Sequence, residues 1–204
     1  MQLTMNNNTS KTATMTPQVN QGGHSVFDVH EVLSGIIDTL DQYLLLQQHT
    51  KDPELVDIIN RQHQFILDQY NIMVESFKSG QDPSRPTSSY KMTQSNEVVY
   101  GLNPSQPRKP IQNVSELNEQ GISGHMLGLL KQGAGSLTMA SLECTNPVLR
   151  RILADSIPNF VEMAYEVFLY QNKHQYYQVP QLAPQDMQQL LNGYAPGANR
   201  TMMN

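Results

Sequence analysis

Hydrophobic residues recur at intervals of three and four positions in four segments of the chain. Two of these segments lie within residues 25–80 and two within residues 115–175, and polar residues fill most of the positions between the hydrophobic ones. This spacing places the hydrophobic side chains on one face of an α-helix, which is typical of a helix that packs against a core. The pattern therefore predicts four amphipathic helices.

The first predicted helix begins at a capping box formed by Asp28 and Glu31 and ends near His49. Its expected apolar face consists of Val26, Val29, Leu33, Ile36, Ile37, Leu40 and Leu44.

The second predicted helix has sharper bounds. Asp52 can cap its start, Pro53 suits the first helical position, and Gly80 suits its end. Its expected apolar face consists of Leu55, Ile58, Ile59, Gln62, Ile66, Tyr70, Met73 and Phe77.

The second pair of helices shows the same signals. Asn146 followed by Pro147 repeats the start of the second helix, and Pro158 predicts a local kink in the fourth. Small residues around Gly133 allow a neighbouring helix to approach closely. The third helix is expected to place Met126, Leu130, Gly133, Leu137, Ala140 and Cys144 on one face, and the fourth Leu149, Ile152, Leu153, Ser156, Phe160, Met163, Val167 and Tyr170.

The two pairs are weak copies of each other, because superposing Pro53 on Pro147 also superposes Leu55 on Leu149 and Ile58 on Ile152. Two such pairs predict an all-α, ferritin-like antiparallel four-helix bundle joined by a long crossover. We therefore expect a disordered polar N-terminus (1–24), a first helix pair (25–80), a Pro-rich crossover linker (81–114), a second helix pair (115–175) and a C-terminal tail (176–204) with a short helix at 185–191.

Composition narrows the functional classes. The chain is rich in amide side chains, only 15% of its residues are charged, and its formal net charge is −5. The pairs Arg108-Lys109 and Arg150-Arg151 do not amount to a basic surface, so no nucleic-acid partner is expected. The single cysteine excludes an internal disulfide, and no secretory signal or apolar run of about 20 residues is visible. We expect synthesis in the cytoplasm and no membrane span.

A ferritin-like bundle raises the question of a di-iron centre, which needs inward Glu residues and two Glu-x-x-His motifs. The second helix offers Asp57 with Asn60, the third offers Glu143, and the fourth offers Glu162 with Tyr165. No imidazole occupies the required positions. We therefore predict no metal-binding, cofactor-binding or catalytic residues.

The remaining reactive side chains favour a structural role. The six histidines are scattered, and no two lie three or four positions apart. Cys144 ends a helix and follows Glu143, and both features disfavour a thiolate, so it is expected to be a small buried residue. The many Tyr, Gln and Lys residues are chemically suited to crosslinking, a hypothesis that competes with simple packing of the tyrosines.

Three elements in the second half carry a resemblance to a known family. These are a small-residue helix beginning Gly124-His125-Met126-Leu127-Gly128, the turn Glu143-Cys144-Thr145-Asn146-Pro147 with Arg150, and the aromatic close Tyr176-Tyr177-Gln178-Val179-Pro180. Together they resemble the spore coat protein F (CotF-like) family of endospore-forming bacteria, well over residues 115–182 and loosely over 25–80. Family members often end with a Gly-Trp-Tyr-like element, whereas this chain has no Trp, which indicates a coat F-like relative.

The resemblance implies a ferritin-like fold and a structural place in the spore coat without catalysis. The implied partners are other spore coat proteins, with a second copy of the chain as one possibility. Two alternatives stay open: a ferritin-like metal-binding or redox protein, and an interaction module in the developing spore.

Overall fold

A computed structural model describes residues 22–197, so most of the N-terminal segment predicted to be disordered lies outside the described residues. Within these residues, five α-helices follow one another: α1 (Gly23–Gln47), α2 (Pro53–Ser79), α3 (Glu119–Glu143), α4 (Pro147–Lys173) and α5 (Pro184–Leu191). A 3-10 turn, η1 (Val114–Glu116), precedes α3. The described residues contain no β-strand, only isolated bridges from Val179 to Tyr100 and Gly101. The predicted all-α fold is confirmed.

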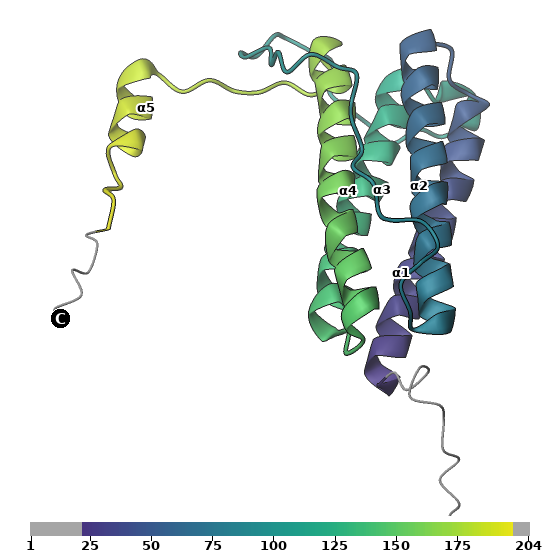
Figure 1. Cartoon of the computed structure of the whole chain (residues 1–204). Coiled ribbons are helices and arrows are strands. Elements are labelled where there is room, and N and C mark those ends of the chain that lie inside the picture. The colour runs from purple at the N-terminus through teal and green to yellow at the C-terminus, as the bar shows by residue number, and fades with distance from the viewer. Residues whose placement is uncertain (1–21, 198–204) are drawn as a thin grey trace, which may run out of the picture.

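The four long helices form one antiparallel bundle (Figure 1). Each helix packs against two others, so that the order around the bundle is α1, α2, α4 and α3. The bundle therefore has a seam between α2 and α4 and, on the opposite side, a seam between α1 and α3. Within residues 22–197, no helix is both long and apolar enough to cross a membrane.

The core agrees with most of the predicted apolar faces. All eight residues predicted for α4 are buried, from Leu149 to Tyr170. Gly133 of α3 faces Phe160 of α4, and a Cβ added to this glycine would lie 2.5 Å from Cε1 of the Phe160 ring. Real Cβ atoms do not approach other atoms so closely, so the small residue permits the close packing of α3 on α4.

The predicted helix starts are confirmed for α2 and α4. Asp52 Oδ1 accepts the backbone N–H of Glu54 at 2.9 Å, and Asn146 Oδ1 accepts those of Val148 and Leu149 at 3.0 and 2.9 Å. Gly80 ends α2 in the left-handed conformation, with φ of 68°.

The prediction for the start of α1 is wrong. This helix begins at Gly23, so Asp28 lies inside it and not at its N-cap. A tertiary contact replaces the capping box: the Ser25 hydroxyl donates to the carbonyl of Glu143 at 3.2 Å and accepts the N–H of Thr145 at 3.0 Å. These bonds extend the helix toward the α3–α4 turn, an effect that local sequence does not reveal.

The apolar face predicted for α1 is rotated relative to the observed one. Ile37 and Leu44 are 42% and 48% exposed, whereas Val32, Tyr43 and Leu46 are buried. The first half of the chain contains more apolar residues than one helix face can bury. One of the residues left at the surface, Leu45, is 55% exposed and lies on the α1/α3 side of the bundle.

The crossover (residues 80–118) first runs along the outside of the α2/α4 seam in an extended form, as far as Val99 near the end of α4, and then continues over the ends of α4 and α3 to the start of α3 (Figure 1). Asn159 of α4 fixes part of it, because its side chain bonds to the N–H of Tyr90 at 2.9 Å and to the carbonyl of Ser88 at 3.0 Å. Farther along, Asn172 bonds in the same way to both backbone groups of Val99, at 2.7 and 3.0 Å. The helix α5 lies apart from the bundle at the end of an extended segment.

Candidate functional site

A buried carboxylate lies at the α2/α4 seam. Glu166 of α4 is 0% exposed, and both of its oxygens accept hydrogen bonds. Oε1 accepts from Arg61 Nη2 at 2.9 Å and from the backbone N–H of Thr93 at 3.0 Å. Oε2 accepts from Gln62 Nε2 at 3.0 Å and from the Tyr90 hydroxyl. The carboxylate therefore links α2, α4 and the crossover.

The surrounding groups are held in the protonation states that this network needs. Burial, reinforced by the bond to Glu166, raises the pKa of Tyr90, so its hydroxyl remains a donor. Burial also acts to lower the pKa of Arg61, but the bonds to Glu166 and Asp57 outweigh it, and the pKa lies above its ordinary value. Burial raises the pKa of Tyr43, whose hydroxyl donates to Gln62 Oε1 at 2.7 Å. The network therefore consists of the ion pair between Arg61 and Glu166, together with uncharged groups of Gln62 and Tyr90 that donate hydrogen bonds to the carboxylate.

This network differs from the carboxylates weighed in the sequence. Asp57, Asn60 and Glu143 are exposed and Glu162 is only half-buried, so these side chains do not meet inside the bundle. Glu166 was missed, although a signal existed: it lies three residues after Met163 on the predicted apolar face of α4. Arg61 and Tyr90 could not be assigned from periodicity, because one borders the apolar face and the other lies in the crossover.

A second cluster joins the start of α2 to the end of α4. His174 Nε2 lies 3.8 Å from Asp52 Oδ2 and 3.8 Å from Glu54 Oε2, and these three atoms lie within 4.8 Å of one another. Lys173 Nζ contacts both oxygens of Glu54, at 3.0 and 2.9 Å, and the Tyr170 hydroxyl donates to Asp52 Oδ2 at 2.8 Å. By spacing alone the three residues could hold a metal ion, but an ammonium group already neutralises Glu54.

The charges of this second cluster suit the helix ends that carry them. Acidic groups lie at the positive N-terminus of α2 and basic groups at the negative C-terminus of α4. Partial burial acts to raise the pKa of Asp52, but the bonds from Tyr170 and the Glu54 backbone outweigh it and the pKa lies below 3.8. Asp52 is therefore ionised, and the cluster has the chemistry of an ion-pair link. Periodicity did not reveal this cluster, because its members on α2 and those at the end of α4 are more than 100 positions apart.

Cys144 lies at the end of α3 and is 6% exposed. Burial raises the pKa of its thiol, which disfavours the nucleophilic thiolate. The thiol contacts the carbonyl of Asn146 at 3.7 Å. This environment is that of a packed side chain, as the sequence indicated.

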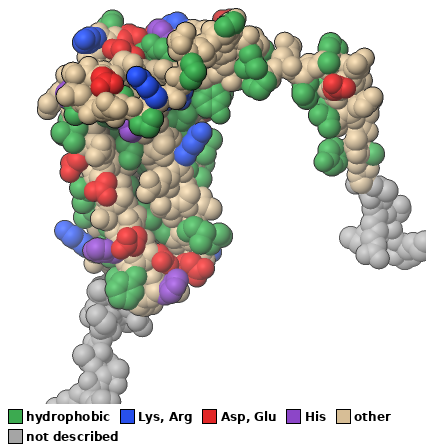
Figure 2. Space-filling model, turned by 180° about the vertical axis from the view of Figure 1, so that it is seen from behind, with side chains coloured by type: hydrophobic (Ala, Val, Ile, Leu, Met, Phe, Trp, Pro, Cys, Tyr) green, Lys and Arg blue, Asp and Glu red, His purple; other side chains and the backbone are tan. Residues whose placement is uncertain are grey.

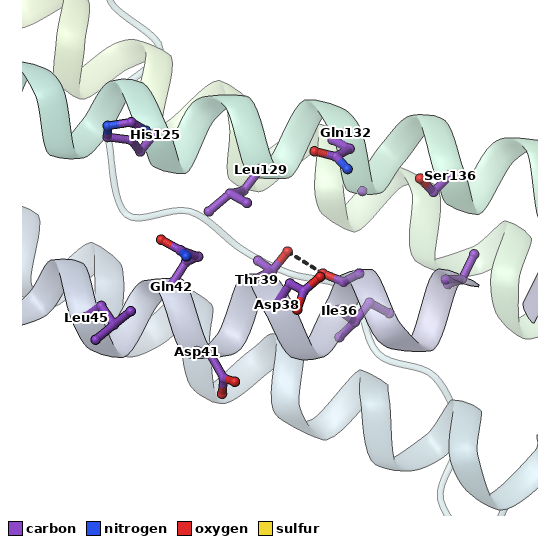
Figure 3. A pocket seen from close by; sticks show the side chains of 13 residues that line it. Ile36, Asp38, Thr39, Asp41, Gln42, Leu45, His125, Leu129, Gln132 and Ser136 are labelled. Atoms are coloured by element: carbon purple, nitrogen blue, oxygen red, sulfur yellow. Dashed lines mark hydrogen bonds between the residues drawn. The ribbon is translucent and has the colours of Figure 1, made fainter. Parts of the chain in front are cut away.

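An open groove follows the α1/α3 seam and has a volume of about 610 Å³. Its apolar residues come from both helices: Val32, Ile36 and Leu45 from α1, and Leu129 with Gly133 from α3. In Figure 3, the polar residues lie along its length, with Gln42 of α1 directed toward α3 and Asp41 directed away from it. The groove also includes Asp38, Thr39, His125, Gln132 and Ser136.

The polar side chains of the groove are not paired for acid–base chemistry among the described residues. The Thr39 hydroxyl is engaged with the carbonyl of Gly35 at 2.8 Å, within its own helix (Figure 3). Among the described residues, no hydrogen bond or ion pair joins His125 to Asp38 or Asp41, so no acid–base pair is assembled. An elongated, partly apolar groove between two helices is instead typical of a surface that receives another helix.

The comparisons with known proteins all match proteins or domains of the spore coat. The family model of the Coat F domain matches residues 118–180. The spore coat protein F-like protein YhcQ of Bacillus subtilis (strain 168) is 56% identical over 175 residues, which cover 86% of this chain and 81% of that protein. The crystal structure of a candidate spore coat protein from Bacillus halodurans C-125 matches with a TM-score of 0.57 and 15% identity, covering 80% of this chain and 95% of that one. At this identity the structural match supports the fold alone.

Proposed function

The chain belongs to the spore coat protein F family, and from this premise we propose that it acts in the coat as a structural component that assembles with other proteins and catalyses no reaction. Its place in the spore coat agrees with the family resemblance found in residues 115–182. Fold alone would not support such a role, because helical bundles host many functions. The family match supports a place in the spore coat, and the chemistry of the sites described above supports the structural role.

The structural role is supported by the hydrogen bonds of the buried carboxylate at the α2/α4 seam. The carboxylate of Glu166 accepts four hydrogen bonds, and these hold the crossover against the bundle. An acid or base that acts on a substrate must face a space that the substrate can enter. Glu166 is enclosed, whereas the α1/α3 groove has a mixed polar and apolar lining. This division suits a scaffold that presents surfaces to partners.

Localisation in sporulating cells tests the proposal. A fluorescent fusion to the full chain is expected to form a ring at the spore surface, and coats extracted from purified spores are expected to contain the chain. A diffuse signal in the forespore, with a soluble pool and one discrete partner, would favour the interaction-module alternative. Elemental analysis of the purified protein addresses the metal-binding alternative, for which stoichiometric iron or manganese would be decisive.

A further inference from the structure

The helix α5 presents an apolar face that no other described part of the chain covers. Met187, Leu190 and Leu191 are 40%, 61% and 65% exposed, and their spacing places them on one side of the helix. Tyr194, seven positions after Met187, is 93% exposed. Figure 2 shows hydrophobic side chains on the segment that projects from the bundle. An isolated helix of eight residues is marginal in water, so its stability depends on a surface to dock against.

The α1/α3 groove matches α5 in length and in chemistry. The helix is about 12 Å long at 1.5 Å per residue, and the groove follows α1 from Val32 to Leu45, about 20 Å. Side chains spaced as in α5 are the anchors by which helices bind apolar grooves. The polar positions of α5 are mostly glutamines. Gln188 borders the apolar face and can bond to amides of the groove such as Gln132, whereas Gln185 and Gln189 lie on the opposite side of the helix.

The place where the arm is anchored favours the groove of another copy over the chain's own. Val179 is fixed by its bridge to Gly101, which leaves residues 180–183 to carry α5. Just before them, the Tyr177 ring packs on Phe168 of α4 and lies near Lys131 of α3, so the anchor is on the α3/α4 side of the bundle and α3 separates it from the groove. In the structure the segment carries α5 beyond α4, away from α1, and leaves the chain's own groove uncovered (Figure 1).

The geometry points to a second copy of this chain as the occupant: α5 of one copy lies in the α1/α3 groove of another, with Met187, Leu190 and Leu191 on its apolar floor. One such contact is small beside the 20 to 30 residues per partner, roughly, of a stable interface. Reciprocal exchange of arms in a two-fold dimer doubles it, and exchange of an element between copies is an economical route to dimers. This inference names a partner for the assembly role and rests on it.

Sedimentation of the full chain is the first test. The unchanged protein is expected to associate at concentrations of about 10 to 100 µM, as suits a contact of this size. Replacing both leucines, Leu190→Ser with Leu191→Ser, is expected to leave only monomer. The control, Gln185→Ser with Gln189→Ser on the same helix, is expected to associate normally. Both variants should unfold thermally like the parent, because α5 contributes nothing to the bundle core.

Disulfide trapping identifies the occupant. In a Cys144→Ala background, one chain carries Gln188→Cys on α5 and the other carries Gln132→Cys in the groove. On mild oxidation the mixture is expected to give a disulfide-linked pair. Replacing the groove cysteine by Arg150→Cys, which is exposed on α4, should reduce this yield at least tenfold.

Three results would overturn the docking: a parent protein that stays monomeric throughout, association that survives loss of both leucines, or a disulfide that forms only within one chain when both cysteines are placed in it. Failure here is separable from failure of the coat role. A chain that reaches the spore surface yet never self-associates retains the coat role and loses the docking. A chain that exchanges arms in solution yet stays diffuse in the forespore does the reverse.

Discussion

The α2/α4 seam and the α1/α3 seam, on opposite sides of the bundle, are covered differently. At the α2/α4 seam the crossover lies over the helices, and the carboxylate of Glu166 bonds to Arg61, Tyr90 and the backbone of Thr93. At the α1/α3 seam no described segment of the chain performs that task, and a groove of about 610 Å³ remains. The sequence repeat does not relate these two seams to each other, because it superposes α2 on α4 and α1 on α3, so that each seam joins corresponding helices of the two pairs. The difference teaches that the chain completes one side itself and leaves the other available to partners.

The closed seam predicts the largest loss of stability. Glu166→Ala leaves Arg61 and Tyr90 without their shared acceptor in a mostly buried position. Breaking a buried ion pair from one side costs about 3 to 5 kcal/mol, and the lower end applies because Arg61 is 26% exposed. Urea unfolding is expected to show a loss of about 3 kcal/mol. Glu162→Ala, half-buried on the same helix, should change the free energy of unfolding by less than about 0.5 kcal/mol.

A value below about 1 kcal/mol for Glu166→Ala would mean that the polar network does not hold the seam together. The closed seam would then depend on apolar packing alone.

Substitution of Gly133, at the contact between α3 and α4, is expected to have the next largest effect on stability. The control substitution on the same helix is expected to have an effect of opposite sign. Gly133→Ala places a Cβ 2.5 Å from the Phe160 ring, so overpacking of about 1 to 3 kcal/mol outweighs the helix-propensity gain of about 1 kcal/mol. Gly135→Ala has nothing within 4 Å of its Cβ and should stabilise the protein by about 0.5 to 1 kcal/mol. Thermal unfolding measures both. Equal stabilisation by the two substitutions would show that α3 lies farther from α4 than described.

Tyr90→Phe tests how the crossover is attached. The change removes one hydroxyl that donates to Glu166 and accepts from Arg61 Nη1 at 2.7 Å, with an expected cost of about 1 to 2 kcal/mol. Limited proteolysis should become faster within the crossover and nowhere in the helices. Tyr100→Phe, in the same crossover but 60% exposed, is the matched control and should leave cleavage unchanged. Unaltered cleavage in Tyr90→Phe would place the attachment elsewhere.

The smallest effect concerns the link between the start of α2 and the end of α4. The pKa of Asp52 lies below its ordinary value, so its charge stabilises the fold above about pH 4 and this contribution is lost as the pH falls through the lowered pKa. Asp52→Asn keeps the helix cap and removes the charge, with an expected cost of up to about 1 kcal/mol at pH 7 that diminishes as the pH falls through that lowered pKa. Asp38→Asn, exposed on α1, should change the free energy of unfolding at pH 7 by less than about 0.5 kcal/mol. Any pH-independent loss in Asp52→Asn would instead indicate an altered cap.

Local signals predicted the parts of this molecule that local chemistry determines. Asp52, Asn146 and Gly80 mark helix ends because their side chains or backbone act on the adjacent turn. The faces of α3 and α4 follow from helical periodicity for the same reason. The start of α1 did not, because the Ser25 hydroxyl bonds to the backbone of Glu143 and Thr145, about 120 positions away.

The sites show the same limit. Glu166 was within reach of prediction, since a carboxylate on an apolar face demands a partner. Its partner Arg61 and the crossover residue Tyr90 depend on how the crossover lies across α2 and α4, which periodicity does not describe. The groove was not predicted, because the apolar face expected for α1 included Ile37 and Leu44, and only the packing shows that Leu45 stays 55% exposed beside α3.

Amide hydrogen exchange on the full chain, at low and at high protein concentration, tests most directly whether one seam is closed by the chain and the other by a second copy. Residues 88–93 of the crossover are expected to be protected at both concentrations, whereas α5 and the groove-facing part of α1 should gain protection only at the higher one. Free exchange in the crossover at both concentrations, or full protection of α5 at the lower one, would contradict this account of the two seams.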